Sequence, residues 1–104
     1  MPKEFTEDLQ KLFLGFLISD KDLYVRIQSL VVPMYFNNKL RPAVTLINEH
    51  SEKYNSLPTI DQIKAKTGIE VEIDSEVTVR HKEWFLDEFQ DFAKFKALEQ
   101  AILA

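Results

Sequence analysis

Residues 84 to 103 read WFLDEFQDFAKFKALEQAIL and carry five aromatic side chains within a helical repeat of apolar positions. The polar residues Glu83, Asp87, Gln90 and Lys94 recur at three- and four-residue spacing, which predicts a solvent-facing stripe. The apolar arc that remains is wider than the 100° or so that a helix packed on one surface needs. The segment therefore predicts a long helix with more apolar surface than one neighbour can cover.

The apolar arc divides into two flanks, for which we expect different roles. The flank of Phe85, Phe89 and Phe92 is predicted to be core, because the earlier helices also have apolar faces that must be covered. We expect residues 95–103 to project beyond the shorter helices, where an exposed apolar surface normally meets an oligomeric or other protein partner. The candidate interface on the second flank consists of Trp84, Phe95, Leu98 and Ile102.

Two short helices are predicted in the first third of the chain. Apolar residues at helical spacing, preceded by the polar start of Thr6, predict a helix over residues 6–18. Ser19 and Asp20 offer capping oxygens for a second helix, which Pro33 ends or redirects.

Two more helices are predicted in the middle of the chain. The third should run over about 39–54, after an asparagine pair that can cap it, with Pro42 in its first turn. Thr59 followed by Gln62 is a capping box that starts a fourth helix, and Gly68 is placed to stop it. The predicted buried face of the third helix is made of Leu40, Ala43, Val44, Ile47 and Tyr54.

Residues 69–79 alternate apolar and acidic side chains, but the chain has no second convincing strand for them to pair with. We therefore predict an extended loop there, held by its apolar side chains, and a final helix that begins between residues 74 and 80. The expected fold class is all-α. A small helical head of residues 1–80 should precede residues 81–104, which would form the first arm of a helical hairpin.

Composition excludes several classes of protein. At 104 residues the chain is one small domain, and its formal net charge of −4 provides no basic face for direct nucleic-acid binding. It has no cysteine, its longest apolar runs are far too short to span a bilayer, and its first residues do not open a signal peptide. We therefore expect an intracellular protein that does not enter membranes.

The sequence predicts no catalytic, cofactor or metal site. Its two glycines, Gly15 and Gly68, cannot form a phosphate-binding loop, and His50 and His81 have no second ligand or nucleophile at useful helical spacing. An acidic run could in principle gather a divalent cation, but it lacks the pattern of a calcium loop and is better interpreted as a solvated loop or a patch for a basic partner. The run contains Glu70, Glu72, Asp74 and Glu76.

The order of motifs along the whole chain resembles the N-terminal domain of DnaB-type replicative DNA helicases, particularly those of tailed phages. The motifs are short apolar and turn patterns, so the resemblance lies in their order and spacing. They are Leu12-Phe13-Leu14-Gly15-Phe16-Leu17, Tyr35-Phe36, Tyr54 through Leu57-Pro58-Thr59, Trp84-Phe85-Leu86-Asp87-Glu88 and Lys96-Ala97-Leu98-Glu99-Gln100-Ala101-Ile102.

This resemblance implies an all-helical head and a helical hairpin that pairs with hairpins of neighbouring subunits to form a collar in a hexameric helicase. The ATP site and the DNA-contacting loops of such helicases belong to a RecA-like domain, which this chain lacks. The expected role is therefore non-catalytic: subunit assembly and docking of primase or a helicase loader during DNA replication. The resemblance also implies a second hairpin arm beyond Ala104, and a location in the cytoplasm, that of the bacterial host if the protein is phage-encoded.

Two alternatives remain from the residues alone. One is a free-standing adaptor that binds another protein through its C-terminal amphipathic helix. The other is a small metal-dependent enzyme that uses the carboxylates of residues 70–76, although no base, nucleophile or ligand set converges there at recognisable spacing.

Overall fold

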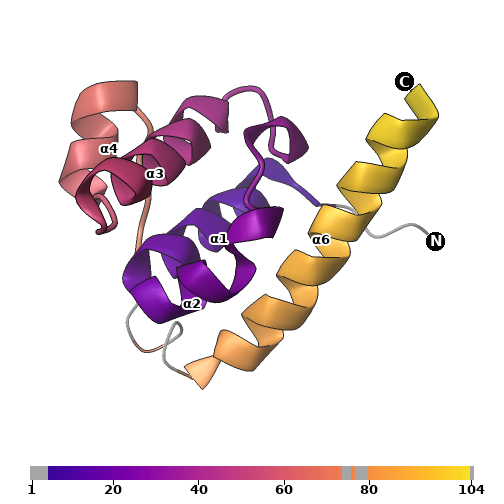
Figure 1. The fold of residues 1–104 in the computed structure, drawn as a ribbon, viewed down its shortest axis with the longest axis horizontal. Helices are drawn as coiled ribbons and strands as arrows, with labels where there is room; N and C mark the ends of the chain where they lie inside the picture. The colour runs from indigo at the N-terminus through magenta and orange to yellow at the C-terminus, as the bar shows by residue number, and fades with distance from the viewer. Residues whose placement is uncertain (1–4, 74–75, 77–79, 104) are drawn as a thin grey trace.

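The protein is all-α, as predicted, and residues 5–73, 76 and 80–103 are described by a computed structural model (Figure 1). Within these residues there is no strand. The α-helices are α1 (Glu7–Ser19), α2 (Lys21–Ile27), α3 (Arg41–Tyr54), α4 (Ile60–Thr67) and α6 (Lys82–Leu103), with two 3₁₀ turns, η1 (Gln28–Leu30) and η2 (Pro33–Tyr35).

The first two helices start where the capping residues predict. The Thr6 hydroxyl accepts a hydrogen bond from the Leu9 amide at 3.2 Å, and the Asp20 carboxylate accepts from the amides of Asp22 and Leu23. Each cap satisfies amides that have no partner inside the helix. The chain after α2 tightens into η1 and then η2, with Pro33 at the start of η2.

Helix α3 begins later than predicted and ends at Tyr54 as predicted, but the burial of that last residue differs from the prediction. It begins at Arg41, because the Asn37 carboxamide oxygen accepts from the Lys39 amide and so caps the turn that precedes the helix. At the other end, the prediction that Tyr54 is buried is wrong, since 58% of this residue is exposed. Tyr54 lies in the last turn of α3, beyond the part of the helix that the core covers. The rest of the predicted face is buried, at Leu40, Ala43, Val44 and Ile47.

The predicted signals around α4 are confirmed. Thr59 and Gln62 form a reciprocal capping box, in which each side chain bonds to the other residue's amide. Gly68 ends the helix in the left-handed conformation, at φ 74°, which a residue without a Cβ adopts at little cost.

Much of the aromatic part of the core forms where α1 and α6 pack against each other (Figure 1). Phe13 of α1 meets three α6 rings, with centroid distances of 5.5–5.7 Å and tilted or edge-to-face geometry. Such aromatic contacts add to the free energy of burial. The predicted core flank of α6 is confirmed, since Phe85, Phe89 and Phe92 are all fully buried.

Helix α2 is tied to α3 by a polar link. The Tyr24 hydroxyl donates to the Asn48 carboxamide oxygen at 2.5 Å, and the Asn48 amide donates to the Val31 carbonyl at 2.8 Å. Tyr24 is fully buried, and this burial raises the pKa of its phenol. The link therefore satisfies polar groups that would be costly to bury alone.

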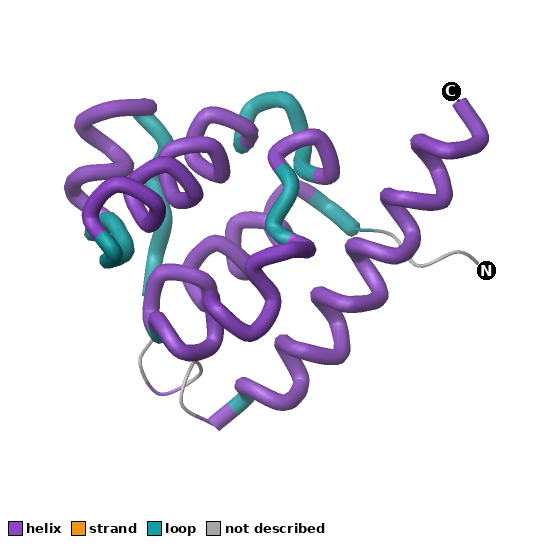
Figure 2. The backbone as a smooth tube through the Cα atoms, viewed as in Figure 1, coloured by secondary structure: helices purple, strands orange, loops and turns teal. Residues whose placement is uncertain are grey.

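Residues 69–73 form an extended loop with neither helix nor strand, as predicted (Figure 2). Val71 anchors it in the core at 2% exposure, and the Glu72 carbonyl lies directly over Gly15 of α1. Helix α6 then begins at Lys82, later than the predicted start between residues 74 and 80. Asp74, one of the predicted acidic candidates, lies outside the described residues.

The prediction that residues 95–103 project beyond the head is only half right. The Gln100 amide donates to the Met34 carbonyl at 2.7 Å, so η2 holds one side of this distal segment. Its other side stays open to solvent, because the short η2 turn can cover only one face of a helix. The open side is where the candidate interface lies.

Candidate protein-interaction surface

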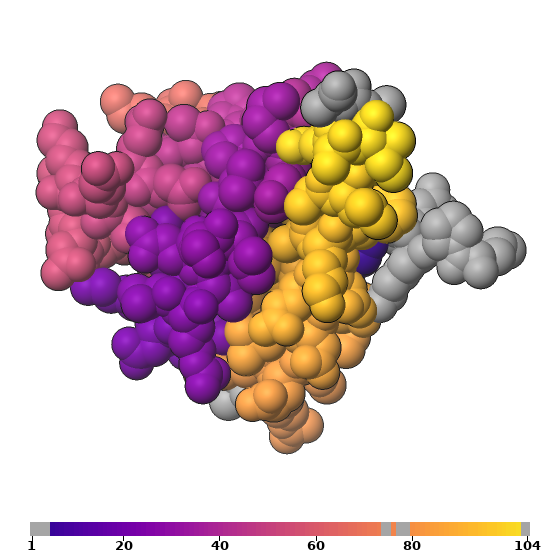
Figure 3. Space-filling model, turned by 45° about the vertical axis from the view of Figure 1, so that its right-hand side comes forward, coloured from indigo at the N-terminus to yellow at the C-terminus, as the bar shows by residue number. Residues whose placement is uncertain are grey.

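Helix α6 crosses one side of the molecule with much of its length open to solvent (Figure 3). The four residues of the candidate interface are all exposed large hydrophobics. Leu98 and Ile102 are the most open, at 63% and 76%, whereas Trp84 and Phe95 are at 39% and 37%. The apolar side chains therefore become more exposed toward the C-terminal end of α6.

Trp84 and Phe95 are partly covered by α1 and the residue that leads into it. The Trp84 ring lies 6.1 Å from the Phe16 ring, and the Phe95 ring lies 5.9 Å from the Phe5 ring. The earlier residue Phe5 therefore meets the later residue Phe95, and Phe16 meets Trp84, so α1 and α6 run antiparallel. We call this line of contact between the two helices the seam. The stacked rings at Phe16 and Phe85, 4.7 Å apart, close its inner side.

Two residues of α1, Leu9 and Leu12, lie along the seam although the sequence did not assign them to the interface. Leu9 and Leu12 occupy positions between Phe5 and Phe16 at four- and three-residue spacing, so they lie on the same face of α1. Leu12 is 37% exposed and Leu9 is partly buried against the core. The only sequence signal for them was the helical spacing that they share with Phe5 and Phe16, which does not say that this face borders α6.

The candidate interface is not continuous along α6. Trp84 and Phe95 are separated by eleven residues, or about 16 Å at the helical rise. Glu88 and Asp91 fall on the same side of the helix between them, at 100° per residue. Phe95, Leu98 and Ile102, in contrast, follow one another at spacings of three and four. We call these three residues the distal patch.

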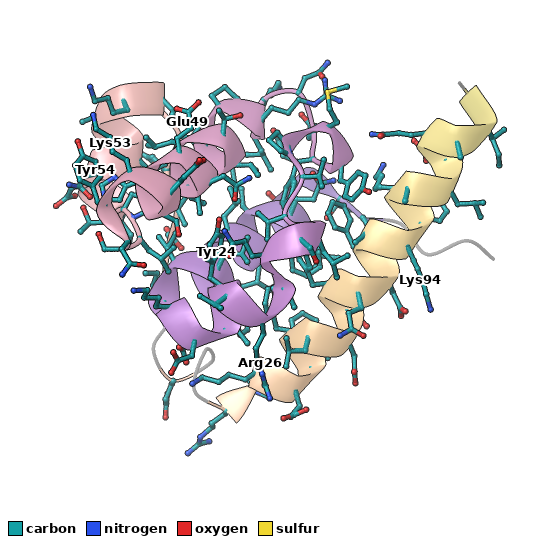
Figure 4. All side chains as sticks on the ribbon, viewed as in Figure 1. Tyr24, Arg26, Glu49, Lys53, Tyr54 and Lys94 are labelled. Atoms are coloured by element: carbon teal, nitrogen blue, oxygen red, sulfur yellow. The ribbon has the colours of Figure 1, made fainter. Side chains whose placement is uncertain are left out.

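Charged groups frame the distal patch. The Lys96 ammonium lies 5.8 Å from the Phe95 ring centroid and pairs with the Glu99 carboxylate at 3.8 Å. Lys94 is exposed on the neighbouring stripe and points away from the head (Figure 4). A polar rim around an apolar centre is the usual composition of a protein–protein interface.

The other sequence candidates do not converge on a chemical site. Within residues 5–73, 76 and 80–103, no three His, Asp or Glu side chains gather in a way that could hold a metal ion. Glu70 instead pairs with the Lys64 ammonium at 3.2 Å. His50 is half-buried beside the Tyr54 ring, and His81 is exposed.

In the described part of the chain, no helix combines the length and apolar character that crossing a bilayer requires. No protein-family model, curated protein or solved structure matches this chain. The described residues thus present an all-α domain whose clearest exposed feature is the apolar side of α6.

Proposed function

We propose that this chain is a non-catalytic assembly and docking domain that acts through the open side of α6. More specifically, we propose that it is the N-terminal domain of a DnaB-type replicative DNA helicase. In that role it joins subunits of the hexamer and offers a surface for primase or a helicase loader. It neither hydrolyses ATP nor unwinds DNA by itself.

The observation that carries the proposal is the division of α6 into two apolar flanks. The flank of Phe85, Phe89 and Phe92 completes the core, so it is not available to a partner. The distal patch is therefore apolar surface that α6 does not need for its own packing against the core. Burying an apolar side chain such as Leu98 or Ile102 stabilises an association by about 1.5–3 kcal/mol, before the losses of freedom on binding are counted.

The order of motifs supports the finer assignment to a replicative helicase. The resemblance places a first hairpin arm at residues 81–104, and α6 occupies this part of the chain. In such a hairpin the open side of the first arm would be covered by a second arm or by a neighbouring subunit. The distal patch is suited to either, because it is apolar and follows helical spacing.

Sedimentation velocity across a concentration series tests the proposal. We expect the mass of the isolated chain to rise reversibly with concentration, toward a dimer or a larger ring, as copies cover each other's distal patches. A mass that stays monomeric at every concentration contradicts self-assembly. That outcome favours the second candidate, an adaptor whose distal patch binds a different protein, because the same surface would then need another partner.

A further inference from the structure

A second surface lies at the opposite end of the molecule from α6, between α3 and α4 (Figure 4). A groove of about 770 Å³ runs there, and a neighbouring hollow of about 680 Å³ continues it toward the start of α3. The two share Leu46, Glu49 and Lys66, so they form one groove along α3. The fourteen residues of α3 span about 20 Å, the length of roughly six extended residues.

The floor of the groove is apolar and partly aromatic. Tyr54 is the largest exposed side chain in it, and its ring lies 4.7 Å from the His50 ring, centroid to centroid. The Lys53 ammonium lies 5.3 Å from the Tyr54 centroid, so both neighbours of the Tyr54 ring come from α3 itself. Leu46 and Ala65 complete the apolar lining. Tyr54, which the sequence grouped with the apolar face of the third helix, thus lines the groove.

The rim of the groove is basic. It carries the cations Arg41, Lys53 and Lys66 against the single carboxylate of Glu49, although the whole chain has a net charge of −4. Over the described residues, no carboxylate pairs with any of the three cations. Arg41 is oriented by the carbonyls of η2 and Phe36, to which it donates hydrogen bonds.

From this combination we infer that the α3–α4 groove is a docking site for an acidic protein segment that alternates carboxylate and apolar side chains. The carboxylates meet the basic rim, and the apolar side chains rest on Tyr54 and Leu46. Glu49 accepts hydrogen bonds from backbone amides of the segment, whereas it would repel the phosphates of a nucleic acid. This inference does not depend on the helicase assignment, since the groove uses no residue of α6.

The test is a titration of the ¹⁵N-labelled chain, followed by amide chemical shifts, with a short peptide that alternates glutamate and leucine. A peptide that alternates glutamine and leucine is the matched probe without charge. We expect the glutamate peptide to shift amides of α3 and α4, with an affinity that falls as salt is added. Equal binding of the glutamine peptide, or no shifts from the glutamate peptide at millimolar concentration, overturns the inference.

Charge reversal provides the second arm of the test. The double variant Lys53→Glu with Lys66→Glu should weaken binding of the glutamate peptide by about tenfold or more, because attraction becomes repulsion. Lys94→Glu makes the same chemical change on α6 and should leave binding unaltered. Lys53→Gln with Lys66→Gln gives an intermediate loss without adding repulsion. Undiminished binding by either double variant, or tighter groove binding of a single-stranded oligonucleotide than of the peptide, contradicts the inference.

The docking proposal for the α3–α4 groove and the assembly proposal for the distal patch can be tested independently. The charge-reversal variants should sediment as the unaltered chain does, because they leave the distal patch intact. A concentration dependence of their mass that differs from that of the unaltered chain would place the groove within the assembly interface, and that would contradict its assignment to an acidic partner segment.

Discussion

The Lys82 ammonium lies 2.5 Å from a carboxylate oxygen of Asp20, 62 positions earlier in the sequence. Asp20 also caps α2 through its other carboxylate oxygen, which accepts from the amides of Asp22 and Leu23. One side chain thus starts α2 and holds the first turn of α6 beside it. The pair therefore holds the N-terminal end of α6 next to the junction of α1 and α2.

The first prediction concerns acid pH. The hydrogen bond from Lys82, together with the amides of Asp22 and Leu23, holds the pKa of Asp20 below its usual value of 3.8, against the opposing effect of burial. The unfolded chain therefore binds this proton at a higher pH than the folded chain does. The stabilisation is complete about one pH unit above the unfolded-state pKa and is lost as pH falls through the folded-state pKa.

Asp20→Asn isolates the ion pair, because asparagine is also a good N-cap. It should lower the free energy of unfolding by about 0.5–1 kcal/mol at neutral pH, the range for a partly exposed pair. This difference should shrink toward acid pH and at high salt. Urea unfolding of both chains at several pH values measures it, and a difference that grows as pH falls contradicts the sign derived for Asp20.

The second prediction concerns Gly15. Helical glycine is usually less stable than alanine by about 0.5–1 kcal/mol, so Gly→Ala in a helix normally stabilises. Here the added methyl group would clash with the Glu72 carbonyl, which is backbone and cannot rotate away. Gly15→Ala should therefore lower the free energy of unfolding by about 1–3 kcal/mol, as overpacking does. A more stable Gly15→Ala chain in urea unfolding would show that residues 69–73 do not lie on α1.

The third prediction separates the two flanks of α6. Phe89 is fully buried, with the rings of Phe13, Phe85 and Phe92 all within 6 Å between centroids. Phe89→Ala should lower the free energy of unfolding by about 3–5 kcal/mol, since it leaves a cavity. Leu98→Ala should change it by no more than about 0.5 kcal/mol in the monomer. Chemical unfolding at low concentration compares them, and equal costs would contradict the division into flanks.

Some of these features could be predicted from the sequence because they depend on neighbouring residues. Three of them are hydrogen bonds between residues a few positions apart, so the residue types alone predict them: the Thr59 and Gln62 capping box, the Gly68 stop and the Asp20 cap. The core flank of α6 was also predictable, because Phe85, Phe89 and Phe92 repeat at helical spacing in a chain that has one core to fill.

Other features depend on how distant segments meet. Tyr54 shares the helical phase of Ile47, but phase cannot tell where the covering helix ends, so its exposure could not be predicted. The approach of Glu72 to Gly15, the pairing of Lys82 with Asp20 and the α3–α4 groove all join residues far apart in the sequence. Leu9 and Leu12 entered the candidate interface only once α1 was placed beside α6.

The fourth prediction uses the absence of cysteine from the chain. If two copies meet through their distal patches, Leu98→Cys places two thiols near each other, and mild oxidation should join them rapidly in a disulfide-linked dimer. Gln90→Cys lies on the solvent stripe of the same helix and should cross-link much more slowly. Non-reducing electrophoresis over time compares the rates, and equal rates at the two positions would indicate random collision.

The measurement that tests the central claim most directly is sedimentation velocity of Leu98→Glu beside the unaltered chain over one concentration series. Gln90→Glu is the matched control, since it adds the same charge to an exposed position of α6. The account predicts that Leu98→Glu stays monomeric where the unaltered chain and Gln90→Glu associate, with the helical content unchanged by circular dichroism. Association of Leu98→Glu equal to that of the unaltered chain would contradict the assignment of the distal patch as the assembly surface.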